Sequence, residues 1–317
     1  MSMEILQTLH MSGDTGLEYN FLTEFMNIMV SSYSNTVRFG PLFAKLPATP
    51  DNYYIGCTSN IPRMSSQSRY PVQAAATTFQ VIETLHHLDG AGVSELSEEL
   101  EMPKSTVHDH LQTLTEAEYL VNENGTYHVG ARFLELGGFA RSQMKLYQVA
   151  SPEIKKLANE TGEHANLMIE EHGKGIFLNK AKGPDAVNLD THIGKRVHLH
   201  TTALGKAILS RESEEVVDEI IDRHGLPGVT EKTITDRDEL KSQLDEIRDR
   251  GYAIDDEERV IGMRCVAAPI CNENDRPIGA ISVSGPTNRF DDDIFKAEIP
   301  KSVLSTANVI EVNMTYS

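Results

Sequence analysis

The segment KSTVHDH at 104–110 concentrates side chains that form hydrogen bonds. Ammonium, hydroxyl and imidazole groups are among those that bind phosphates and the edges of bases in DNA. Most of them lie off the apolar helix face predicted by the spacing of Val107, Leu111 and Leu114. The segment is therefore a candidate for nucleic-acid contact. Its contributing residues would be Lys104, Ser105, Thr106, His108 and His110, with Thr126 further along the chain.

Flanking segments predict the elements that would hold these residues. An amphipathic helix is expected at 74–88, and a short second helix begins at Ser94, a residue type that caps helices. Pro103 ends that helix, and a third opens directly after it. Asn124-Gly125 lies between two β-prone runs, which predicts a hairpin. Three helices and a hairpin make a winged helix-turn-helix at 70–135; the alternative is a small helical subdomain that only packs.

The charge distribution argues against a simple DNA-binding surface. The chain has 29 basic and 47 acidic residues, a net charge of −18. Residues 70–140 hold eleven acidic residues but only Lys104 and Arg132 as basic ones, a net charge of −9. Either this segment does not bind DNA, or its acidic residues face away from the duplex, or the protein works in concentrated salt, where the Debye length is about 3 Å at 1 M. We favour the last two together, which predicts a host that accumulates salt.

Length and composition set outer bounds on the class of protein. A chain of 317 residues is expected to form two folded domains. No apolar run approaches the roughly 18 residues of a transmembrane helix, and no Lys or Arg precedes Arg38 as a signal peptide would require. Cys57, Cys265 and Cys271 form no C-x-x-C pair and no disulfide framework. We expect a cytoplasmic protein with no membrane partner, metal ion or cofactor.

Residues 1–69 differ from the rest of the chain. They are rich in Phe and Tyr, poor in charge and without sustained periodicity. They are expected to be either a disordered extension or sequence upstream of a true translation start at Met64. We assign no function to them.

The second half of the sequence alternates helices and short strands. A helical pattern continues from the hairpin over 131–147, and we expect a linker helix at 136–150. Ser151-Pro152 would then begin a new helix. The pattern predicts an α+β domain at 151–317 with one mainly antiparallel sheet. Strands are expected at 166–169, 175–179, 186–189, 266–270 and 278–284, and helices at 203–210, 214–224, 236–250 and 292–312.

Five separated motifs in one order resemble the IclR family of transcription regulators. GYAIDDEERVIGMRCVAAPI at 251–270, AISVSGP at 280–286 and TTALGKAILS at 201–210 are similar to its C-terminal half. KSTVHDHLQTL at 104–114 and GTYHVGARFLELG at 125–137 resemble its DNA-binding half. The resemblance covers about residues 70 to 317.

The resemblance implies a winged helix-turn-helix joined to a GAF-like effector domain, in homodimers or dimers of dimers. It implies an operator affinity that a small organic molecule, often a carboxylate or an aromatic compound, modulates. One departure is His108-Asp109-His110, where the family usually has an arginine. Carried over by position, the effector contacts would be Ala203 and Leu204 through backbone donors, and Asp255, Cys265, Ser282 and Ser284 through side chains.

Other functions remain open from the residues alone. Cys265 could be a buried apolar residue or, with a histidine in reach, a nucleophile; Ser282, Ser284 and Asp255 could be plain sheet and loop residues. A metal site is a further alternative for the histidines, because His198 and His200 form an H-x-H pair. The acidic segment also fits a ligand sensor that acts through a protein partner without binding DNA. We favour a non-enzymatic regulator over all of these. The histidines considered for Cys265 are His164, His192, His198 and His200, and the last three are those considered for a metal.

Overall fold

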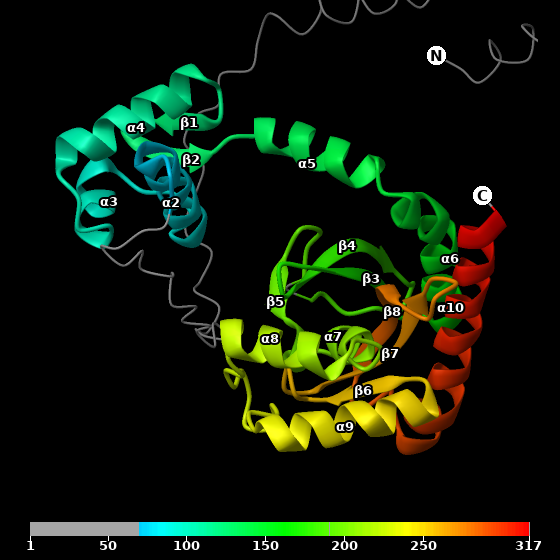
Figure 1. Cartoon of the computed structure of the whole chain (residues 1–317). Helices are drawn as coiled ribbons and strands as arrows, with labels where there is room; N and C mark the ends of the chain where they lie inside the picture. Colours follow the sequence, from blue (N-terminus) through cyan, green and yellow to red (C-terminus); the bar gives the residue numbers. More distant parts are fainter. Residues whose placement is uncertain (1–69, 190, 317) are drawn as a thin grey trace, which may run out of the picture. The chain divides into compact units, whose positions relative to one another are not determined.

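The computed structural model describes residues 70–189 and 191–316, so the predictions for residues 1–69 lie outside the described residues. The first described elements form a winged helix-turn-helix (Figure 1). They are α2 (Gln73–His87), α3 (Val93–Glu99), α4 (Lys104–Glu116), β1 (Leu120–Glu123) and β2 (Thr126–Val129).

One apolar cluster holds these elements together. The three leucine and valine positions predicted for the inner face of α4 are all buried in it. The prediction of Ser94 as the helix cap is wrong, because Gly92 precedes the first turn and Ser94 lies within α3. Ser94 Oγ instead accepts a hydrogen bond from Lys104 Nζ at 2.8 Å. The cluster consists of Val81, Leu85, Ala91, Leu96, Val107, Leu111, Leu114 and Leu120.

The wing hairpin follows the sequence pattern closely. Leu120 pairs with Val129, and the strands turn at Asn124 and Gly125 with φ angles of 56° and 94°. Two consecutive positive φ angles are typical of the type I′ turn, whose twist matches a two-residue hairpin. The predicted turn is confirmed.

The connection to the second domain differs from the prediction. A break after α5 (Arg132–Ser142) separates it from α6 (Lys145–Thr161), with Met144 in an extended conformation between them. The predicted start at Ser151-Pro152 is wrong, since Pro152 lies inside α6. Ser151 Oγ donates back to Tyr147 O at 2.6 Å, and α6 buries Ile154 and its neighbours against the sheet. Apolar burial along the whole helix therefore outweighs the local capping signal.

A six-stranded antiparallel sheet forms the centre of the second domain, in the order β5-β4-β3-β8-β7-β6. The predicted α+β class with an antiparallel sheet is confirmed. The predicted strand at 186–189 is wrong: Ala186 N closes a turn on Gly183 O, and Val187 O pairs with the His164 ring. The strands are β3 (His164–Glu171), β4 (Lys174–Lys182), β5 (Arg196–His198), β6 (Ala253–Asp256), β7 (Met263–Cys271) and β8 (Pro277–Pro286).

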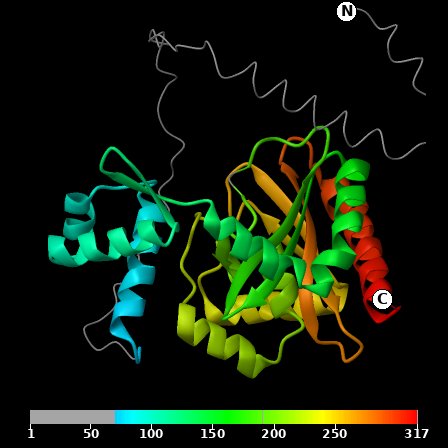
Figure 2. The same cartoon turned by 90° about the horizontal axis from the view of Figure 1, so that it is seen from above.

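The sheet carries helices on both faces. On one face, α6 lies beside α10 (Ile299–Tyr316), as Figures 1 and 2 both show. A π-helical turn at Ile294–Glu298 precedes α10. The opposite face is covered by α7 (Ala203–Leu209), α8 (Glu214–His224) and α9 (Arg237–Arg250). Within the described residues, no helix is long and apolar enough to span a membrane.

Candidate functional site

The predicted effector residues of three strands meet on the sheet face that α7 covers. Asp255 of β6 pairs with Cys265 of β7, which in turn pairs with Ser284 of β8. Ser282 lies two residues before Ser284 and therefore on the same face. Ser282 is fully buried and Asp255 is 5% exposed, whereas Cys265 and Ser284 are half-buried. The sheet thus brings four of the predicted side chains into one polar row.

Asn166 joins this row from β3, opposite Ser282. Its Nδ2 lies 3.3 Å from both Ser282 Oγ and Ser284 Oγ, and Ser284 Oγ donates to Cys265 Sγ at 3.1 Å. Sequence analysis missed this role. The available signal was an amide side chain in a predicted strand whose following residues are apolar.

The two backbone positions of the prediction, Ala203 and Leu204, are buried in the first turn of α7 rather than in a loop. First-turn amides have no acceptor within their own helix, so they remain suited to a ligand. Thr202 caps the helix and accepts from Gly205 N at 2.9 Å. A Cβ on Gly205 would lie 2.1 Å from Leu199 O, so glycine is needed for this close approach.

Asp255 lies in a charged environment that the sequence did not reveal. Its Oδ1 accepts from Glu258 N at 2.8 Å and from Arg259 N at 3.3 Å. Both carboxylate oxygens of Glu258 lie 2.6 Å from Lys206 Nζ, and Lys206 is fully buried. Burial raises the pKa of the Asp255 carboxyl to about 7; Glu258 also raises it, while Lys206 and the two amides lower it. The signal for Lys206 was a lysine within the otherwise apolar run ALGKAIL.

The geometry disfavours Cys265 as a nucleophile. Burial raises the pKa of its thiol to about 12, with Asp255 adding to the effect, so the reactive thiolate is suppressed. Its hydrogen-bond partner is Ser284, and β8 separates it from His164 of β3. The enzyme alternative requires a histidine in reach of the thiol, and the described side-chain hydrogen bonds of Cys265, Ser282 and Ser284 go to one another and to Asn166.

The histidines considered for a metal ion have other partners. The rings of His198 and His200 are 5.6 Å apart. Lys174 Nζ lies 2.9 Å from His198 Nε2, and His200 Nε2 pairs with Pro227 O at 3.1 Å. Burial lowers the pKa of His198 to about 4, with Lys174 contributing in the same direction. Over residues 70–189 and 191–316, no three His, Cys, Asp or Glu side chains are arranged to hold a metal.

The predicted DNA contacts lie on α4 and the wing. Lys104, Ser105 and His108 are exposed, whereas Thr106, His110 and the wing residue Thr126 are half-buried. His110 Nδ1 lies 2.9 Å from Thr78 Oγ1 of α2, which leaves its Nε2 for an outside partner.

Arg132, the other basic residue of the acidic segment, is exposed at the start of α5 and bonds to the end of α4. Its Nη1 donates to Ala117 O at the end of α4, and its guanidinium lies 4.9 Å from the Tyr119 ring centroid. Lys104 is the cation of this segment that lies on α4, the helix proposed to contact DNA.

Comparisons with known proteins agree with both halves of the fold. Residues 74–123 match the IclR helix-turn-helix domain, and residues 139–312 match the C-terminal domain of bacterial IclR regulators. The HTH-type transcriptional regulator ArcR of Halobacterium salinarum is 32% identical over 77% of this chain and 94% of its own length. The transcriptional repressor IclR of Escherichia coli is 31% identical over 77% of this chain and 90% of its own length.

Solved structures show the same arrangement of elements. The Thermotoga maritima IclR structure aligns with a TM-score of 0.62 at 26% identity, covering 76% of this chain and 98% of that chain. An IclR homolog from Microbacterium hydrocarbonoxydans, crystallised with 4-hydroxybenzoate, aligns with a TM-score of 0.65 at 24% identity over 77% of this chain and all of that one. The latter shows the likeness of fold alone.

A winged helix-turn-helix followed by a sheet domain defines a class of transcription regulator that joins a DNA-binding module to a second, C-terminal domain. The two domain matches and the curated relatives make the assignment specific. The chain belongs to the IclR family of transcription regulators.

Proposed function

We propose that this regulator binds an operator through α4 and the wing, and that a small organic acid bound in its C-terminal domain changes its affinity for DNA. The observation that carries the proposal is the polar row of Asp255, Cys265, Ser282 and Ser284, which lies on the sheet face that α7 covers. Hydroxyls, a thiol and backbone amides are donors to a carboxylate or a phenol. Small-molecule sites combine a few such groups with apolar walls, which α7 supplies here.

Base contacts are assigned to the exposed polar side chains of α4. Ser105, Thr106 and His108 would meet base edges and Lys104 a phosphate, with His110 Nε2 and Thr126 at the margins. A gel shift with the protein's own promoter region in molar KCl tests this. Ser105→Ala and His108→Ala should each weaken binding by about tenfold, because one base contact accounts for roughly 1–3 kcal/mol.

Gln112→Ala is the matched control, since Gln112 is also exposed on α4 but pairs with Glu116 in the same helix. Equal affinity of all three variants and the unchanged protein would contradict the assignment.

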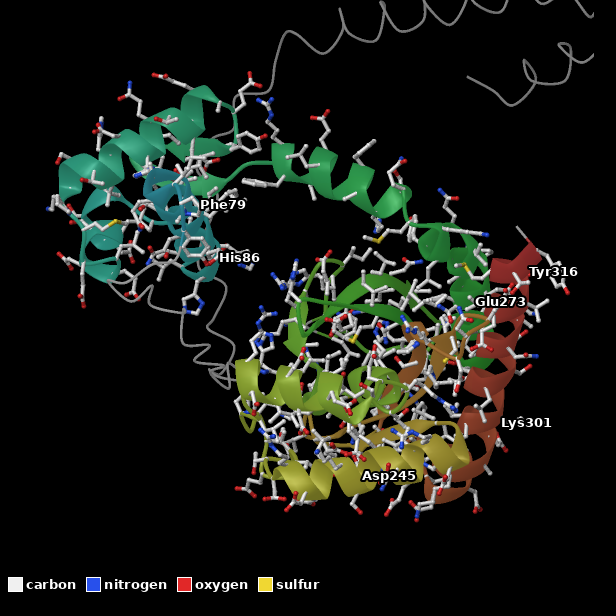
Figure 3. The ribbon with its side chains drawn as sticks, in the orientation of Figure 1. Phe79, His86, Asp245, Glu273, Lys301 and Tyr316 are labelled. Carbon is white, nitrogen blue, oxygen red and sulfur yellow. The ribbon has the colours of Figure 1, made fainter. Side chains whose placement is uncertain are left out.

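A homodimer is proposed from uncovered apolar side chains. α5 buries none of its residues, and Leu134 and Phe139 are 76% and 66% exposed. Phe79, labelled on α2 in Figure 3, is 64% exposed. A contiguous apolar patch marks an interaction site, and α5 exposes Leu134, Leu136 and Phe139 along one short helix. The second copy is the occupant that fits a regulator of palindromic operators.

Light scattering after gel filtration measures the mass in solution. Leu134→Glu with Phe139→Glu should shift the protein toward the monomer, whereas Lys301→Glu on the exposed side of α10 should leave the mass unchanged. A double variant that keeps the dimer mass would place the interface elsewhere.

A sensor that acts through a protein partner is the second candidate, and the net charge of −9 over residues 70–140 favours it. The promoter gel shift separates the two: no shift in molar KCl, with a specific partner recovered from the native host, would support the sensor. Placement in the cytoplasm, where the DNA lies, follows from the regulator proposal.

A further inference from the structure

The charge state of the polar row determines which ligands it accepts. The Ser284 hydroxyl already donates to Cys265, and Ser282 and Ser284 both accept from Asn166. Ser282 and Ser284 also both lie within hydrogen-bonding reach of the Cys265 thiol. These donors are all neutral, so Asp255 is the titratable charge within the row, while the Arg259 guanidinium acts on Cys265 from the following loop.

Two buried carboxyl groups share a single ammonium group beside this row. Lys206 reaches from α7 and holds both oxygens of Glu258, so its charge is already balanced. Asp255 is bonded to two backbone amides of its own loop rather than to a cation. An unpaired buried carboxylate is costly, and a second carboxylate nearby favours retention of a proton.

The other groups that face Asp255 do not alter this balance. Across the strand pair lies the neutral thiol of Cys265. From the same loop, the Arg259 guanidinium lies 5.6 Å from the Phe177 ring centroid. Thr230 and Thr233 fix the loop by donating to Glu258 O at 2.9 and 2.6 Å. The combined effect is the raised pKa of Asp255, at about 7.

We propose that the site binds a carboxylate effector with uptake of one proton, and that the proton resides on Asp255. The neutral Asp255 then donates a hydrogen bond to the ligand carboxylate, while an ionised Asp255 would repel it. One proton moves from solvent to Asp255, and no covalent bond to the ligand forms. This inference rests on the proposed effector site and specifies its ligand as an organic anion rather than a neutral compound.

A ligand-free experiment tests the proton on Asp255 by itself. The midpoint of urea unfolding is measured from pH 5 to pH 9, these being proposed conditions, for the unchanged protein and for Asp255→Asn. Because the folded pKa is raised, the stability that protonation supplies is lost as the pH rises through about 7. Asp255→Asn should therefore be relatively more stable above pH 7 than below it. A constant difference between the two proteins across this range would overturn the proposal.

A ligand experiment tests the coupling with benzoate and its neutral analogue benzamide as probes. Calorimetry in two buffers of different ionisation enthalpy should show uptake of about one proton per benzoate at pH 8, and the affinity should fall about tenfold per pH unit above 7. Benzamide should show neither effect, and Asp255→Asn should abolish the pH dependence for benzoate. Ser282→Ala, as a control, should weaken binding but keep the pH dependence.

The possible failures are distinguishable. Benzoate binding that is independent of pH overturns the proton coupling and leaves the effector site standing. Preference for benzamide at every pH also overturns it. If neither probe binds at any pH, the result counts against the effector site itself and against the coupling built on it.

Discussion

Lys206 is among the largest fully buried side chains of the residues described, and its ammonium is held at 2.6 Å by both oxygens of Glu258. The pair ties α7, which carries Ala203 and Leu204, to the loop that follows Asp255 at the end of β6. Two walls of the proposed site are therefore fixed to one another by a single ion pair. A buried pair of this kind adds little net stability over an apolar pair, but removal of one partner leaves a charge without compensation.

Glu258→Gln should lower the free energy of unfolding by about 3–5 kcal/mol, because Lys206 stays buried without its counterion. Lys156→Met removes the exposed pair with Glu160, whose atoms are 3.9 Å apart, and should change it by about 0.5 kcal/mol or less. Urea unfolding at the protein's working salt concentration measures both. Equal, small effects would mean that the buried pair contributes no more to stability than the exposed pair.

At the scale of elements, α7 depends on one glycine. Gly205 lies where a Cβ would meet Leu199 O at 2.1 Å, and the capping bond from Gly205 N to Thr202 fixes the same turn. The whole helix is buried, so the clash cannot be relieved toward solvent.

Gly205→Ala should therefore destabilise the protein, by at least the 1–3 kcal/mol typical of an overpacked core. Gly137→Ala on α5 is the matched control, since a Cβ there meets no atom within 4 Å. The control should be stabilised by up to about 1 kcal/mol through helix propensity. Thermal unfolding of both variants measures the difference, and two shifts of the same sign would contradict the expectation.

Periodicity was sufficient to predict most elements of the fold. The inner face of α4 and the Asn124-Gly125 turn were predictable because local signals and tertiary packing agree there. The break at Met144 and the continuation through Pro152 were not, since burial of α6 against the sheet overrides the local cap. The segment at 186–189 has strand-forming residues, but its backbone groups bond to a turn and to His164.

The residues of the candidate site likewise divide into those that the sequence could place and those that it could not. Residues two apart on one strand, such as Ser282 and Ser284, could be placed on one face from the sequence. Asn166 and Lys206 could not be joined to them, because only the sheet order and the packing of α7 bring together segments far apart in the chain. Contact over long sequence separation leaves no periodic signal.

At the scale of the whole molecule, the net charge of −18 sets the conditions for DNA binding. Lys104 is the cation of the acidic segment that lies on α4, whereas Arg132 is bonded to Ala117 O. Counterion release then contributes little to affinity, and hydrogen bonds to base edges must contribute most.

We predict a shallow dependence of operator affinity on salt. One phosphate contact contributes a slope of about −0.9 in a plot of log affinity against log salt concentration, so a dimer with two Lys104 residues gives about −2. Fluorescence anisotropy from 0.2 to 2 M KCl, a proposed range, measures the slope. Lys104→Met should flatten it, and a slope of about −5 or steeper would show that several cations beyond Lys104 meet phosphates.

The hydrogen bond between Arg132 and the end of α4 affects how motion of α5 reaches the recognition helix. Two residues separate the end of the wing from the start of α5. The first side chain of α5, Arg132, donates a hydrogen bond to Ala117 O and lies against the Tyr119 ring. Because of these contacts, the start of α5 is attached to the winged helix-turn-helix. We expect a rotation of α5 to be passed to the end of α4 through this contact, so that a ligand signal would tilt an intact recognition helix rather than unfold it.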